Sequence, residues 1–389
     1  MATPVKKWDQ EVDVVVVGSG GGALVAAIMA HDQGARVVVL ERSDKVGGTT
    51  ARSGGGIWIP LNHRMAEAGF TDSREDAVTY CKRCTAGAAP DELVEVYVDT
   101  AHQMVSYLEK HTPLKLRVTT MPDYESHLEG GKLGGRGMEA EMYPRSELGE
   151  WASKLEPPQP SLMTPVYIEE GRGGTDPVAL EEAIVQRMEK DLLHMGNALV
   201  APLLKACVDR GISILLETRA RELVQEDGRV VGLRAERDSQ DFLVKARGGV
   251  VLACGGFEWN ERLRAQFLPG PIQASCGARG NEGDGLIMAM EVGADLANMN
   301  EVWLYPGTQV PGEEEPDGSP VTRWVLTERT LPHSILVNRH GRRFIDESLN
   351  YNDMTKTMWH FDPATWTPVS KSAAAWVAHL ASVSNMPAP

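Results

Sequence analysis

One stretch near the amino terminus constrains the fold more than any other. An unbroken apolar run over 12–17 leads into a glycine-rich turn, and a helical run then leads to a second apolar strand that ends at Glu41. This order predicts a strand–turn–helix–strand unit of the doubly wound α/β type. A continuous apolar strand is typical of a parallel sheet that is covered on both faces.

The residue types in this unit predict a dinucleotide site. Gly18 permits a tight turn, Gly20 lets the backbone approach a pyrophosphate, and Ala23 lets helix and strand pack closely. The helix N-terminus offers free N–H groups and a positive dipole end to phosphates. Glu41 lies about twenty residues further on, where an acid binds ribose hydroxyls. We therefore expect an adenine dinucleotide cofactor; the alternative is a plain glycine turn.

Composition excludes several other classes. A formal net charge of -15 argues against a nucleic-acid partner, because phosphate binding needs a basic surface. We find no apolar run long enough for a transmembrane segment and no signal peptide, so we expect a cytoplasmic protein. The histidines lack metal-ligand spacing, so we expect no metal. Cys81 and Cys84 form an isolated pair, which we interpret as ordinary helix residues rather than a metal or redox site.

A second glycine-rich segment follows Glu41, over 46–60. So many glycines exclude the interior of a strand or a helix. The segment predicts a flat backbone surface on which a planar group could lie. A flexible loop is the alternative, and Trp58 between two isoleucines argues against it.

The rest of the chain alternates helical and extended patterns. An irregular segment is expected over 112–175, and a domain boundary near residue 305. Asp227 and Gly228 predict a tight turn between two strands. Helices are expected over 76–84, 90–110, 177–211 and 281–294, and strands over 212–216, 220–225, 229–236, 242–246 and 250–254.

Four blocks together resemble the FAD-dependent dehydrogenases that include fumarate reductase flavoproteins and bacterial 3-ketosteroid dehydrogenases. The resemblance covers most of residues 10–360, and only the first block is shared widely with unrelated nucleotide binders. The blocks are Gly18 to Ala23 with Glu41, Gly47 to Pro60, Leu252 to Glu258, and Ile335 to Glu347.

The resemblance implies a Rossmann-like FAD-binding domain of the glutathione-reductase (GR2) type over 1–305, without its usual C-terminal return segment. An incomplete α+β cap or substrate domain with an atypical tail would cover 306–389. Ala220 would contact the adenine through its backbone. The implied FAD-binding residues are Gly18, Gly20, Gly22, Ala23, Glu41, Arg42, Gly47, Gly48, Thr49, Ser53, Gly54, Gly55, Gly56, Ala220, Gly255, Gly256 and Asp284.

One position separates the two branches of the family. Fumarate reductases carry a proton-delivering arginine four residues after their conserved glutamate, whereas this chain has Tyr351 four residues after Glu347, as ketosteroid dehydrogenases do. The family's glycine-flanked arginine is also missing at Thr330. The apolar stretch over 303–306 suits a hydrophobic ring rather than a dicarboxylate, so we favour the ketosteroid branch.

The implied chemistry removes two hydrogens from adjacent carbons next to a ketone. Tyr351 would be the base or proton shuttle, and Tyr124 resembles a second tyrosine that enters the same pocket. A phenol loses its proton only near pH 10, so this role requires help from neighbouring charge or hydrogen bonds. Each tyrosine could instead be an interfacial ring with a satisfied hydroxyl. The partners would be a small hydrophobic ketone and an electron acceptor such as a quinone or carrier.

The chain departs from the family after Tyr351. Members usually continue with a second glycine-rich turn that grips the flavin ring, and no residue that follows Tyr351 here resembles it. Two alternatives therefore stay open beside the ketone dehydrogenase. One is a flavoprotein of the fumarate reductase or succinate dehydrogenase type, and the other is a truncated FAD-binding remnant without turnover.

Overall fold

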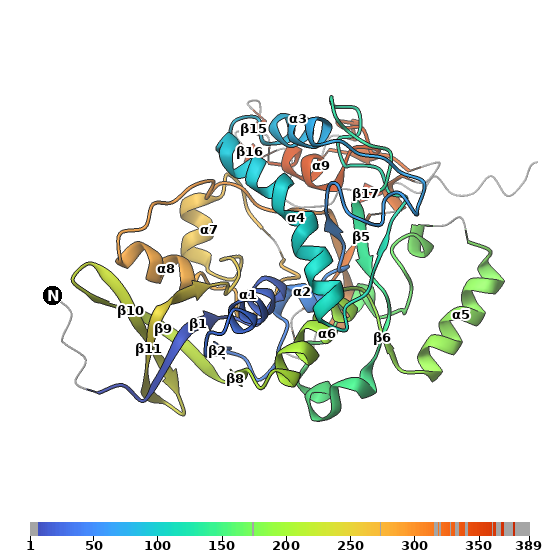
Figure 1. Ribbon diagram of the computed structural model, residues 1–389. Coiled ribbons are helices and arrows are strands. Elements are labelled where there is room, and N and C mark those ends of the chain that lie inside the picture. Colours follow the sequence, from blue (N-terminus) through green and yellow to red (C-terminus); the bar gives the residue numbers. More distant parts are fainter. Residues whose placement is uncertain are drawn as a thin grey trace, which may run out of the picture. The chain divides into compact units, whose positions relative to one another are not determined.

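The computed structural model describes residues 7–172, 175–272 and 274–314, residue 318, and residues 320–326, 328–330, 334–338, 341–359, 361–362, 367–368 and 376–377 (Figure 1). They form two compact units. Unit 1 contains the chain up to Glu261 and Cys276–Ala297, and unit 2 contains Arg262–Ser275 and the chain from Asn298 onward. The domain boundary expected near residue 305 falls inside unit 2. No pattern in the sequence indicated that Arg262–Ser275 also belongs to unit 2.

Unit 1 is built on a six-stranded sheet in the order β8-β2-β1-β11-β10-β9 (Figure 1). Strands β8, β2, β1 and the second half of β11 are parallel, whereas β11, β10 and β9 form an antiparallel meander. This confirms the predicted α/β fold class. The strands are β8 (Ser213–Leu215), β2 (Val37–Leu40), β1 (Gln10–Val17), β11 (Gln240–Leu252), β10 (Arg229–Arg237) and β9 (Thr218–Glu226).

The valines of β1 send alternate side chains into two hydrophobic cores. Val14 and Val16 face the core that α1 (Gly21–Asp32) and α6 (Met195–Asp209) cover. Val15 and Val17 face the opposite core, which includes Met288 of α8 (Asp284–Glu291). Because strand side chains alternate between faces, a continuous apolar strand requires this double cover.

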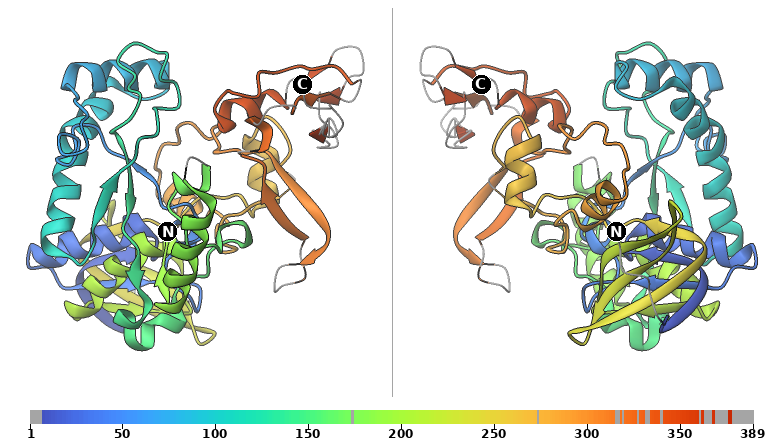
Figure 2. Two further views of the ribbon diagram at one scale, coloured as in Figure 1. Left: turned by 90° about the vertical axis from the view of Figure 1, so that its right-hand side faces the viewer. Right: turned by 90° about the vertical axis from the view of Figure 1, so that its left-hand side faces the viewer.

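A smaller sheet in the order β3-β5-β4 lies beside α4 (Figures 1 and 2). Buried residues of α4 recur every three or four positions and pack with this sheet. The expectation of purely irregular structure over 112–175 was therefore wrong, because strands of two to four residues leave little periodic signal. The elements are β3 (Ile57–Trp58), α3 (Arg74–Thr85), α4 (Asp91–His111), β4 (Leu116–Val118), β5 (Gly137–Ala140), β6 (Tyr143–Pro144), η1 (Arg145–Lys154), η2 (Pro160–Leu162) and η3 (Glu170–Arg172).

Several predicted boundaries also differ. The strands expected over 242–246 and 250–254 are one strand, β11, because Gly248 and Gly249 continue the extended backbone. The helix expected over 177–211 is divided into α5 (Pro177–Glu189) and α6 by β7 (Leu192–Leu193). The helix expected over 281–294 begins only at Asp284, as α8.

Unit 2 has a small core of its own, formed by Leu336, Met354 and Met358. Glu347 ties its segments together, since it accepts hydrogen bonds from the Leu336 N–H at 2.7 Å and from the Arg343 guanidinium. Figure 2 shows the long hairpin of β12 and β13. The elements are α7 (Glu261–Phe267, at the boundary with unit 1), β12 (Gly307–Glu314), β13 (Pro320–Trp324), η4 (Glu328–Thr330), β14 (Leu336–Val337), α9 (Tyr351–Thr357), β15 (Phe361–Asp362), β16 (Thr367–Pro368) and β17 (Trp376–Val377).

Candidate functional site

The turn between β1 and α1 leaves part of a helix N-terminus available to a ligand, although the Gly21 N–H donates to Thr50 Oγ1 at 3.1 Å. Helix α1 begins after Gly20, which has no side chain to cap it, and its first turn contains no acid. The N–H groups of a first helical turn need partners, and together with the helix dipole they favour an anion. The turn therefore suits a phosphate group.

The glycines fall into two groups according to what a Cβ atom would meet. Four of them are required by protein contacts: a Cβ would lie 2.5 Å from the Ala253 oxygen at Gly18, 2.7 Å from the Ala51 Cβ at Gly47, 2.5 Å from Met195 at Gly55 and 2.4 Å from the Asn281 Oδ1 at Gly255. These positions also have positive φ angles.

No protein contact requires the glycines of the second group. A Cβ at Gly22 or Gly54 would have no atom within 4 Å, and a Cβ at Gly20 would make ordinary contact with Thr50 Oγ1 at 3.5 Å. Open space on the bare backbone at both glycine-rich segments is what a dinucleotide needs for close approach. The residues present therefore fit such a cofactor.

Glu41 joins the two glycine-rich segments. Its carboxylate accepts hydrogen bonds from the Ser19 hydroxyl at 2.5 Å and the Ser43 N–H at 2.9 Å, and the Ser19 oxygen accepts one from the Gly47 N–H at 3.1 Å. Burial raises the pKa of the Glu41 carboxyl, while the bonds from Ser19 and Ser43 oppose that shift. Each carboxylate oxygen has a further lone pair, which a ribose hydroxyl could use.

The predicted residues at the adenosine end come from three segments. The Thr218 N–H donates to the Glu41 carbonyl at 2.8 Å, so β9, which carries Ala220, begins beside Glu41. Arg42 donates to Glu282 at 3.0 Å and to Asp284 at 3.4 Å. The structure thus brings Arg42 and Asp284 together in one ion-pair cluster.

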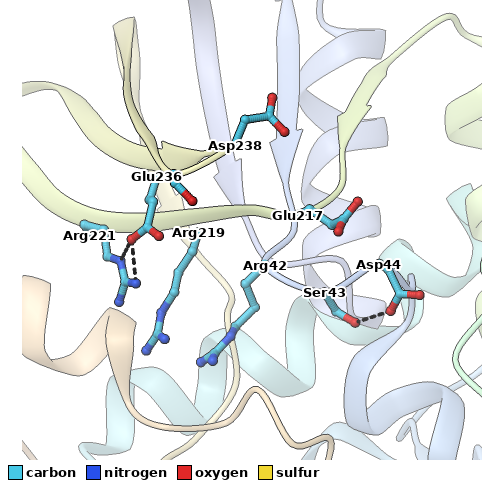
Figure 3. A pocket seen from close by; sticks show the side chains of 9 residues that line it. Arg42, Ser43, Asp44, Glu217, Arg219, Arg221, Glu236 and Asp238 are labelled. Atoms are coloured by element: carbon cyan, nitrogen blue, oxygen red, sulfur yellow. Dashed lines mark hydrogen bonds and ion pairs between the residues drawn. The ribbon is translucent and has the colours of Figure 1, made fainter.

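Arg219, the residue before Ala220, completes this cluster by donating to Asp284 at 2.7 Å. Sequence reasoning missed Arg219, because an arginine in an exposed strand pattern carries no signal of its own. A cleft of about 400 Å³ lies beside the cluster, and in Figure 3 Arg42, Arg219 and Arg221 extend side by side along it. All of its lining residues have polar or charged side chains: Arg42, Ser43, Asp44, Glu217, Arg219, Arg221, Glu236, Asp238 and Ser239.

The second glycine-rich segment contains a short helix, α2 (Gly48–Arg52), so the expectation that no helix forms there was wrong. The N-terminus of α6 satisfies carbonyl groups in and just after α2: the Gly196 N–H donates to the Ser53 oxygen at 3.0 Å, and Asn197 Nδ2 donates to the Ala51 oxygen at 2.7 Å. A packed second helix therefore supports this segment, which local sequence could not indicate.

Asn281 connects the predicted residue Thr49 to the turn after β11. Its Nδ2 donates to Thr49 Oγ1 at 2.9 Å and to Glu258 Oε1 at 2.6 Å, and its side chain lies against Gly255. The flavin-contacting segments predicted around Thr49 and around Gly255 and Gly256 therefore lie next to each other. Asn281 itself was not predicted.

The two predicted catalytic tyrosines belong to different units. Tyr124 lies in unit 1, on the loop between β4 and β5, and is 44% exposed. Tyr351 is the first residue of α9 in unit 2, and its hydroxyl accepts a hydrogen bond from Trp303 Nε1 at 2.9 Å. Their roles stay predictions.

The chain belongs to the FAD binding domain family, whose model matches residues 13–376, and its cofactor is FAD. It is similar to the 3-oxosteroid 1-dehydrogenase of Mycolicibacterium smegmatis, with 36% identity over 90% of this chain and 64% of that protein. It is also similar to the 4-oxocyclohexanecarboxylate 2-dehydrogenase of Sinomonas cyclohexanicum, with 36% identity over 91% of this chain and 62% of that protein.

A solved structure shows the same relationship. The 3-ketosteroid delta1-dehydrogenase from Sterolibacterium denitrificans, in complex with 1,4-androstadiene-3,17-dione, superimposes with a TM-score of 0.82 at 33% identity, covering 90% of this chain and 66% of that one. The chain thus spans slightly less than two thirds of the length of these three proteins. The predicted resemblance to this family is confirmed.

Two further observations concern the described residues only. Within them, no helix is both long enough and apolar enough to cross a bilayer. Among the same residues, no three His, Cys, Asp or Glu side chains are grouped so that they could hold a metal ion. The expectation of a metal-free site stays a prediction.

The substitution Glu41→Gln is expected to weaken FAD binding by about 10- to 100-fold, because a hydrogen bond to a charged group contributes about 1.5–3 kcal/mol. The measurement is reconstitution of apoprotein with FAD, followed by flavin fluorescence. Glu222→Gln is the matched control, since it removes the same charge from β9, where Glu222 pairs with Arg234 at 3.1 Å. Equal FAD affinity in both variants would refute the role of Glu41.

Proposed function

We propose that the chain is the FAD-carrying part of a dehydrogenase that removes two hydrogens from adjacent carbons next to a ketone. The favoured substrate is a hydrophobic ring ketone of the 3-ketosteroid type. The observation that carries this proposal is Tyr351, which stands where resembling fumarate reductases have an arginine. The names of two relatives support it, since a 3-oxosteroid and 4-oxocyclohexanecarboxylate both carry a ketone on a carbon ring.

In the proposed reaction, the ketone acidifies the hydrogens on the neighbouring carbon. Tyr351 acts as a phenolate, whose own proton has first passed to solvent, and receives one of these hydrogens as a proton. FAD, when bound, supplies the acceptor for the hydride that leaves the adjacent carbon. Two C–H bonds break, one C=C bond forms, and both electrons leave with the hydride. Trp303 Nε1 donates to the Tyr351 oxygen at 2.9 Å, which orients the hydroxyl.

Two residues of unit 2, Trp303 and Thr330, support an apolar substrate over a dicarboxylate. Trp303 beside Tyr351 is 66% exposed and offers a large ring surface. Thr330 provides no cation where the fumarate-reducing relatives have an arginine, and two carboxylates need fixed cations. The proposal includes the predicted cytoplasmic location and a quinone or other carrier as the electron acceptor.

The test of the proposal is the visible spectrum of the purified protein without oxygen. We expect the spectrum of bound oxidised FAD, and we expect that added androstenedione bleaches it. Bleaching by succinate and not by androstenedione would instead indicate a dicarboxylate dehydrogenase. Bleaching by 4-oxocyclohexanecarboxylate alone would keep the reaction and change the substrate class.

An FAD-binding chain without turnover is the second candidate. One observation favours it: within the described residues, Gly249 to Leu252 of β11 pair with β1 on one edge, and no strand pairs with their other edge. Such a chain would bind FAD and stay yellow with every ketone and with succinate. Dithionite would still bleach it, which shows that the flavin itself is intact.

A further inference from the structure

A completely buried ion-pair network lies directly beside Tyr124. The Arg136 side chain is 0% exposed and has a carboxylate on either side, from Asp72 at 2.7 Å and Asp123 at 2.8 Å, which are 1% and 2% exposed. A second bond joins Arg136 Nε to Asp72 at 2.9 Å. The guanidinium also lies 5.4 Å from the ring centres of Trp58 and Tyr80.

Both chain neighbours of Tyr124 are held by this network. Asp123 accepts hydrogen bonds from Trp58 Nε1 at 2.7 Å and from the Lys132 N–H at 2.9 Å, in addition to the bond from Arg136. On the other side, the Glu125 N–H donates to the Tyr80 hydroxyl at 3.2 Å. Tyr124 itself is 44% exposed, and these hydrogen bonds hold the residues on both sides of it.

Stability alone does not explain such a network. One guanidinium and two acidic side chains are removed from water together, which is costly. Apolar side chains of similar volume are often equally stable or more stable at such positions. Contacts between apolar side chains have no preferred direction. The hydrogen bonds to Asp123 have a defined geometry, so they determine where the backbone before Tyr124 lies.

We infer that Arg136 and Asp123 are positioning residues, which hold the loop between β4 and β5 so that the Tyr124 ring has one orientation toward the substrate. This inference rests on the proposed function and on the resemblance described above, which implies that Tyr124 enters the substrate pocket. Arg136 is buried and acts only through Asp123 and the loop. The network also holds Trp58 of β3, so the loop and the end of the second glycine-rich segment are fixed to each other.

The first test reads the orientation of Tyr124 without any reaction. The FAD-loaded protein is labelled with 3-fluorotyrosine, and the ¹⁹F signal of Tyr124 is identified by its loss in Tyr124→Phe. We expect one narrow line that shifts or splits in Asp123→Asn and in Arg136→Lys. Arg64→Lys is the matched control, because Arg64 pairs with the buried Glu109 at 2.7 Å within the same unit. An unchanged Tyr124 line in both network variants would overturn the inference.

The second test is a double-mutant cycle on steady-state oxidation of androstenedione, with an artificial electron-accepting dye that reoxidises the flavin. Arg136→Lys is expected to lower kcat by about 10- to 100-fold with little change in KM, as small misplacements of a reacting group do. In the Tyr124→Phe background, Arg136→Lys should cause no further loss of kcat. It should lower Tm by the same amount in both backgrounds. An equal loss of kcat in both backgrounds would show a general structural role and refute positioning through Tyr124.

The two tests separate the inference from the proposed function. A parent protein that no ketone bleaches would contradict the function, while the ¹⁹F line would still decide whether the network orients Tyr124. A line that moves in the network variants and also shifts when androstenedione is added would support both.

Discussion

Tyr351→Phe is expected to slow the reduction of bound FAD by androstenedione by about 10²- to 10⁴-fold, the usual contribution of a positioned base. The substitution removes only the hydroxyl, so the ring can still pack against Trp303, whose centre lies 6.3 Å away. FAD content and Tm should therefore stay close to those of the parent. The measurement is anaerobic stopped-flow absorbance at saturating substrate, which reports the reduction step alone.

Tyr107→Phe is the control for this experiment. Its hydroxyl donates to Asp32 at 2.8 Å on α1, and the proposed reaction does not use it. Removal of that hydroxyl should leave the rate of flavin reduction unchanged. If the FAD of the Tyr351→Phe variant is reduced at the parent rate, Tyr351 is not the base. FAD binding and ketone specificity are tested separately, by the visible spectrum of the parent protein.

Gly196→Ala is expected to destabilise unit 1 by about 3 kcal/mol, at the upper end of what overpacking costs. The added Cβ would lie 2.1 Å from the Thr50 oxygen, 2.7 Å from the Ser53 oxygen and 2.8 Å from the Ala51 oxygen. All three atoms are backbone, so no side chain can rotate away to relieve the contact. Urea denaturation of the apoprotein measures the change in the free energy of unfolding.

Gly22→Ala should behave in the opposite way. No atom lies within 4 Å of the added Cβ, and alanine is favoured over glycine inside a helix by about 0.5–1 kcal/mol. The apoprotein should thus be as stable as the parent or slightly more stable. FAD affinity should fall, because the methyl group would occupy the space assigned to the cofactor. Unchanged affinity would contradict the placement of the pyrophosphate at this turn.

The parts of the fold that were predictable are those that local periodicity encodes. The sequence predicted the strand over 12–17, the turn at Gly18 and the strand that ends at Glu41. Two apolar strands, a glycine turn and a terminal acid in this order are typical of a dinucleotide-binding unit. The turn at Asp227 and Gly228 was predictable for the same reason, since both residues adopt positive φ angles there.

The parts that were missed depend on contacts between distant segments. Asn281 is one asparagine in an ordinary sequence, yet it connects Thr49 with Glu258. Gly196 lies within the helix expected over 177–211 and carries no signal of its own, yet it is the point where α6 meets α2. The open positions at Gly22 and Gly54 could be distinguished from the crowded Gly18 and Gly55 only when their neighbours were known.

The discontinuous composition of unit 2 has a consequence for experiments that dissect the chain. The polypeptide passes between the units after Glu261, after Ser275 and after Ala297, so proteolysis at one crossing leaves two covalent links intact. A fragment cloned from Asn298 onward would also lose Pro271, whose carbonyl accepts a hydrogen bond from Trp359 Nε1 at 3.0 Å. Expression of this unit alone requires both of its segments, rejoined through an artificial linker.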